Sequence, residues 1–174
     1  MSARTSARRA PAPRSVELLL ADATAGVPDG AHTLALARRA FIDAVKRATT
    51  QTERTPMLDV LDAFIRWSLE RPTRLRFRAD DARRDVVSFT RTGSGVLFWS
   101  ARPGREELPR IELLPTARRL LPAEELDAAL ATLNAHSRQP VAPGQALRIG
   151  FGALKNAAAR AAVLARMDQL LVVT

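Results

Sequence analysis

The chain has 174 residues, of which 27 are Lys or Arg and 18 are Asp or Glu, giving a formal net charge of +9 at pH 7. This length suits one domain with its own core, and 47% hydrophobic residues is ordinary globular usage. The chain has no cysteine, which excludes disulfides, thiolate nucleophiles and cysteine-ligated zinc. No apolar run approaches the roughly 18 to 20 residues of a membrane span. We therefore expect a cytoplasmic protein without membrane insertion.

Residues 1–30 are predicted to form a flexible basic tail, and residues 31–174 a single globular domain. Within residues 1–15 there are four arginines and no acid, and prolines and glycines recur up to residue 30. Glu17 and Asp22 interrupt the apolar stretch that a secretory signal would need. An organellar transit peptide shares this composition and is an alternative to a cytoplasmic tail.

Two amphipathic helices are predicted next. From His32 to Ala48, apolar residues recur at steps of three and four positions, as on one face of a helix. The second helix is expected to begin with Thr55 as N-cap and Pro56 at its first helical position. It should end before Pro72, which cannot continue a helix.

The apolar pattern then changes to the period of two that is typical of strands. Leu75 and Phe77 alternate with arginines, so that one face of a short strand is apolar and the other is basic. Gly93, Ser94 and Gly95 separate two β-rich runs and predict a hairpin. The expected strands, which would form an antiparallel meander, cover 74–78, 86–92, 96–101 and 110–114.

The C-terminal part is predicted to contain a helix from Pro122 to about Ser137, a strand over 146–151 and a helix over 154–171. In the last helix, Leu154, Ala158, Ala161, Leu164, Met167 and Leu171 should face inward. The fold class is therefore α+β: two N-terminal helices, an antiparallel meander of three to five strands, and two further helices packed on one face of the sheet. The other face should meet solvent.

Motifs for catalysis or cofactor binding are incomplete. Gly150 and Gly152 lack the third glycine of a dinucleotide fingerprint, whose position holds Lys155. Asp80, Asp81 and Asp85 could hold Mg²⁺, but no acid and lysine follow them in the arrangement that a restriction-type nuclease uses. We therefore expect no cofactor and no metal, and consider enzymatic activity the less favoured class of function.

The remaining functional signal is the position of the charge. Residues 71–110 contain 10 basic and 5 acidic residues, more than half of the net charge of the chain. Arg74, Arg76 and Arg78 should project about 6 to 7 Å apart along one strand face, a spacing comparable to that of successive phosphates. The candidate nucleic-acid-binding residues are Arg74, Arg76, Arg78, Arg83, Arg84, Arg91, Arg102 and Arg105.

Two functions fit this charge pattern. The first is a nucleic-acid-binding accessory protein that contacts the backbone of DNA or RNA independently of sequence. The alternative is a protein-interaction or regulatory module that binds an acidic protein partner. Because 25 of the 27 basic residues are arginines, a GC-rich genome could also account for part of the charge. Competition between nucleic acid and an acidic partner would separate the two functions.

Overall fold

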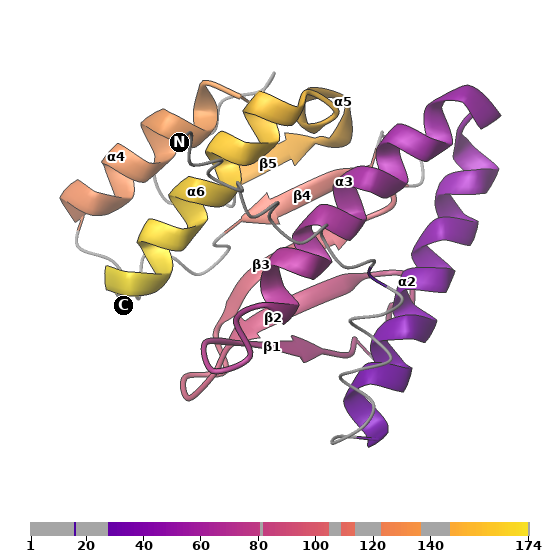
Figure 1. Ribbon diagram of the computed structural model, residues 1–174, viewed down its shortest axis with the longest axis horizontal. Helices are drawn as coiled ribbons and strands as arrows, with labels where there is room; N and C mark the ends of the chain where they lie inside the picture. Colours follow the sequence, from indigo (N-terminus) through magenta and orange to yellow (C-terminus); the bar gives the residue numbers. More distant parts are fainter. Residues whose placement is uncertain are drawn as a thin grey trace, which may run out of the picture.

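The computed structural model of the chain describes residues 16, 28–80, 82–104, 109–113, 123–136 and 147–173. At its centre is an antiparallel sheet of five strands whose order in space is their order in the sequence (Figure 1). The strands are β1 (Leu75–Arg78), β2 (Val87–Arg91), β3 (Leu97–Arg102), β4 (Arg110–Leu113) and β5 (Leu147–Gly150). The predicted meander, and with it the α+β fold class, is confirmed.

The helices cover one face of this sheet (Figure 1). They are α2 (Pro28–Ala48), α3 (Gln51–Leu69), α4 (Ala123–Asn134), α5 (Phe151–Leu154) and α6 (Ala157–Val173). α3 and α6 lie side by side over the sheet, α2 flanks α3, and α4 packs outside α6. Helix α2 thus begins inside the expected tail, and Val16, also expected in the tail, is buried in the hydrophobic core.

Aromatic side chains form the centre of the core between α3 and the sheet. Phe89 and Trp99 are paired across β2 and β3 and stack with ring centroids 5.1 Å apart, and Phe64 of α3 meets Trp99 edge-on. A register shift between Phe89 and Thr90 also lets Phe98, next to Trp99, reach the helices, where it stacks on Trp67. The bulge therefore places two consecutive aromatic residues in one core.

The C-terminal helix is tied to the first half of the chain by ion pairs and hydrogen bonds. Asp168 of α6 accepts two hydrogen bonds from Arg71, at 2.6 and 2.8 Å, and the same guanidinium lies over the Trp67 ring. In α2, Arg38 makes an equivalent two-bond pair with Asp62 of α3. These bidentate pairs fix how the helices sit against one another.

Two helix boundaries differ from the prediction. α3 begins at Gln51 with Thr50 as its N-cap residue, so Pro56 lies inside the helix instead of at its start. The predicted last helix is divided into two helices, because the helix is interrupted at Lys155 and Asn156. The Asn156 Oδ1 accepts hydrogen bonds from the amides of Ala158 and Ala159 and so caps the start of α6. The break changes the phase of the helix, so that Ala158 and Ala161 are exposed and Val163 is buried instead.

Candidate nucleic-acid interface

The sheet face opposite the helices carries a pattern of arginines from four of its strands. The pairing registers align one residue from each strand in a row across the sheet: Arg78, Ser88, Ser100, Glu112 and Arg148. A second row holds Arg76, Thr90 and Leu97, and a third holds Arg102, Arg110 and Gly150. We call the five arginines of these rows, Arg76, Arg78, Arg102, Arg110 and Arg148, the arginine face.

Glu112 organises the part of the arginine face that lies on β3, β4 and β5. Its Oε2 accepts a hydrogen bond of 2.7 Å from Arg102 Nε, and its Oε1 accepts one of 3.2 Å from Arg110 Nε. Arg148 Nε lies 3.6 Å from the same Oε1. One nearly buried carboxylate thus holds three guanidinium groups on adjacent strands, and the cluster keeps a net charge of +2.

On the opposite edge of the sheet, β1 presents its two arginines to solvent. Arg76 and Arg78 are exposed, and their guanidinium groups form no ion pair with any described residue. The strand residues of the arginine face total five arginines and one glutamate, a net charge of +4. The cations on β1 are therefore open to a ligand, while those near β4 are held in place by Glu112.

The hydroxyl groups between these arginines are not available to a ligand. Ser88 and Thr90 are each 6% exposed and Ser100 is fully buried. Thr90 Oγ1 donates a hydrogen bond to the carbonyl oxygen of Arg76. The arginines, with their longer side chains, therefore form the accessible part of this face, and Ser88 and Thr90 do not supplement it as hydroxyl donors to phosphate.

The structure separates Arg74 and Arg91 from the arginine face. Arg74 precedes β1, and its guanidinium donates a hydrogen bond of 2.8 Å to the carbonyl oxygen of Leu171 in α6, on the helix side. Arg91 is in register with Leu75, whose side chain belongs to the apolar face. Burial lowers the pKa of Arg91, and the nearby charge of Arg74 lowers it further. These two arginines therefore form a rim on the helix side.

The other predicted residues occupy the loop between β1 and β2 or fall outside the described residues. Arg83 lies 3.8 Å from Asp85, and Arg84 is exposed beside α2, so neither extends the arginine face. Asp80 accepts hydrogen bonds from the amides of Ala82 and Arg83, as expected for a turn residue. Arg105 lies outside the described residues.

Arg110 and Arg148 are members of the arginine face that were not predicted from the sequence. A signal for them exists, because Arg148 alternates with Leu147 and Ile149, and Arg110 and Glu112 alternate with Ile111 and Leu113. Each alternation is only three or four residues long. It becomes informative only when the pairing register shows which residues share a face.

Other candidate chemistries receive no support from the described part of the chain. No group of His, Cys, Asp and Glu residues there could hold a metal ion. The amide of Phe151, at the start of α5, donates to the carbonyl oxygen of Pro109 at 2.8 Å and so does not face an anion. None of the helices in the described ranges has the length and apolar character of a membrane span.

The aromatic residues narrow the mode of binding that the arginine face allows. The chain has six Phe, two Trp and no Tyr, and each of these eight side chains is buried or half-buried. None is therefore placed as an open stacking platform for unpaired bases.

Comparison of the chain with protein-family models, with curated proteins and with solved structures finds no match.

Proposed function

We propose that the protein binds nucleic acid through the arginine face, mainly by contacts to the phosphate backbone. The observation that carries the proposal is the gathering of five arginines, against one glutamate, on the sheet face free of described helices. Guanidinium groups suit phosphate oxygens because their planar donors match them in pairs. Such contacts position a protein on a nucleic acid without reading its sequence.

The layout of the charges favours a double helix over a single strand. Arg76 and Arg78 lie about 6 to 7 Å apart along β1, and the edges β1 and β5 are about 19 Å apart at the usual strand spacing. A surface of this width can contact phosphates of both strands of a duplex. Proteins that bind single strands combine basic grooves with stacking aromatic residues, and the described residues of this face lack the second component.

The proposal predicts a measurable dependence of affinity on salt. If each of the four net charges neutralises one phosphate, a plot of log affinity against log salt has a slope of about −3.6 for a duplex. Removing two of these charges should reduce the slope by about 1.8. The variant Arg76→Ala/Arg78→Ala removes them from exposed positions of an edge strand, where the fold does not depend on them.

The test is fluorescence anisotropy with a labelled duplex of about 20 base pairs of arbitrary sequence, titrated from about 50 to 200 mM salt. The matched control is Arg39→Ala/Arg47→Ala, which removes the same charge from exposed positions of α2, on the helix side. We expect the salt slope to fall for the β1 variant and to stay near the wild-type value for the control. Equal slopes for the two variants, or no binding at the lowest salt, would reject the proposal.

A competition experiment separates this function from binding of an acidic protein. Polyglutamate and unlabelled duplex are added at equal charge concentration to the preformed complex. If the arginine face is adapted to phosphates, the duplex displaces the label at lower concentration than polyglutamate does. The reverse order would favour the protein partner.

A further inference from the structure

Strand β1 forms an open edge of the sheet. Its neighbour is β2, and it has no other strand partner in the described part of the chain. The amide of Thr92 donates to the carbonyl oxygen of Arg74, so in the alternating antiparallel pattern this carbonyl and the backbone groups of Arg76 and Arg78 face β2. The N–H and C=O of Phe77 therefore point outward. They offer two hydrogen bonds to an additional strand.

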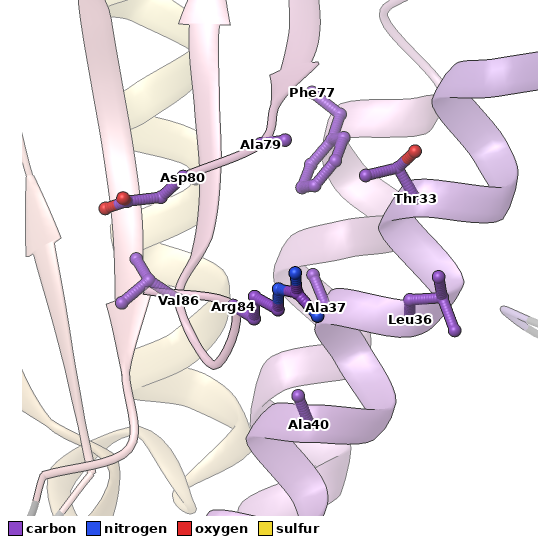
Figure 2. A pocket seen from close by; sticks show the side chains of 9 residues that line it. All are labelled: Thr33, Leu36, Ala37, Ala40, Phe77, Ala79, Asp80, Arg84 and Val86. Atoms are coloured by element: carbon purple, nitrogen blue, oxygen red, sulfur yellow. The ribbon is translucent and has the colours of Figure 1, made fainter. Parts of the chain in front are cut away.

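Below this edge, on the helix side, is a mostly apolar groove of about 570 Å³ between α2 and β1 (Figure 2). Leu36, Ala37 and Ala40 of α2 form one wall, and Phe77 and Val86 contribute to the other. The Leu36 side chain stands out because, at 53% exposure, it is the large hydrophobic residue that is exposed among the described residues. The groove can receive a few aliphatic side chains, which would enter from a strand placed beside β1.

The two sides of the β1 edge have different chemistry. Phe77 points into the apolar groove (Figure 2). The pairing register places Arg76 and Arg78 on the opposite face, where they are exposed. A strand added beside β1 would project alternate side chains to these two sides. Apolar side chains fit the groove side, and acidic side chains fit the arginine side.

We propose that the β1 edge binds an extended segment of another protein in which apolar and acidic residues alternate. The apolar residue opposite Phe77 enters the groove, and the acidic residues opposite Arg76 and Arg78 pair with them. Backbone hydrogen bonds to Phe77 supply affinity, and the alternation supplies specificity. This site shares Arg76 and Arg78 with the proposed nucleic-acid contacts, so an acidic segment and a nucleic acid compete for these two arginines, whereas the groove lies on the other side of the sheet and serves the segment alone.

A second copy of this chain is a poorer occupant than an acidic segment. Antiparallel pairing of β1 with itself would place arginines of the two copies opposite one another, and like charges in such cross-strand positions repel. Charged residues on an edge strand commonly prevent this kind of self-association. Here they also select for a partner of opposite charge.

The test uses a fluorescent peptide of about seven residues that alternates valine and glutamate. Peptides of the same composition in scrambled order, and with lysine in place of glutamate, serve as controls. We expect saturable binding of the alternating acidic peptide and at least tenfold weaker binding of both controls. A version with N-methyl groups on the amides that face β1 should also bind at least tenfold more weakly, whereas methylation of the other amides should have little effect.

Two protein variants locate the site. Leu36→Asp places a carboxylate in the groove without disturbing the core, and should weaken binding of the acidic peptide at least tenfold while leaving the salt slope of duplex binding unchanged. Arg76→Glu/Arg78→Glu should reverse the preference from the glutamate to the lysine peptide. Insensitivity to both variants, insensitivity to N-methylation, or a concentration-dependent dimer that Leu36→Asp abolishes would overturn the proposal.

Discussion

Replacing Glu112 with glutamine should affect folding and nucleic-acid binding in opposite directions. The Glu112 side chain is 9% exposed, and its carboxylate lies within 3.6 Å of three arginines whose side chains remain 21% to 57% exposed. Without it, three guanidinium groups on neighbouring strands repel one another. Breaking a buried ion pair costs about 3 to 5 kcal/mol, and we expect about 3 kcal/mol here because the arginines retain access to water.

Urea denaturation measures the loss of stability. With a typical m-value of about 2 kcal/mol per M, the midpoint should fall by about 1.5 M. At the same time the arginine face gains one net positive charge, so the salt slope of duplex binding should steepen by about 0.9. Glu124→Gln is the matched control, since it removes the same charge from an exposed position of α4. If the Glu112 variant unfolds at the same urea concentration as the control, the carboxylate does not organise the cluster.

Three further predictions concern stability and can be checked by thermal denaturation of single variants. Ser68→Ala leaves the buried Trp99 Nε1 without the acceptor that it reaches at 2.9 Å, and should cost about 2 kcal/mol; no shift in melting temperature would contradict this. Gly95 has a φ of 66° and Gly152 lies in α5, and at both positions an added methyl group would meet no atom of the described residues within 4 Å. Gly95→Ala should therefore destabilise the protein by about 1 kcal/mol, through backbone strain alone. Gly152→Ala should leave the stability unchanged or raise it, because alanine favours a helix more than glycine does. Equal shifts in melting temperature for the two variants would contradict this reasoning. Asn156→Ala removes the N-cap of α6 and should cost about 1 kcal/mol, with Asn156→Asp as the variant that retains the cap.

Much of the sheet could be predicted because its signals are local. Gly93 and Gly95 both adopt positive φ in the turn between β2 and β3, which is the property that made them a hairpin signal. The alternation of Leu75 and Phe77 with arginines likewise located β1. Each of these signals depends on a few consecutive residues.

The helix boundaries were harder because two local signals competed. Thr55 and Pro56 have the residue types of a helix start, yet Thr50 and Glu53 provide an earlier one, with Glu53 N donating to Thr50 O. A proline in the second turn of a helix is tolerated when the rest of the helix packs well, and seven buried residues follow it in α3. The packing of α3 against the core therefore determines where this helix begins, in spite of the start signal at Thr55 and Pro56.

The composition of the arginine face depends on long-range pairing. Arg78 and Arg148 share a row although they are far apart in the sequence, because four successive registers connect them. Arg74, by contrast, is close to Arg76 in the sequence, but its guanidinium reaches Leu171 of α6 on the helix side. Neither fact follows from strand alternation alone, since both require the position of another element.

The position of α6 has a consequence for folding during synthesis. Strands β1 to β4 of the meander can pair as soon as they leave the ribosome, because each is joined to the next by a short connection. The helical layer over the sheet, however, is complete only when α6 docks, because α6 packs against α3, α4 and α5 and its Asp168 and Leu171 bond to Arg71 and Arg74. A nascent chain that ends before residue 157 therefore lacks the core residues Val163, Met167, Leu170 and Leu171, and should depend on chaperones until α6 docks.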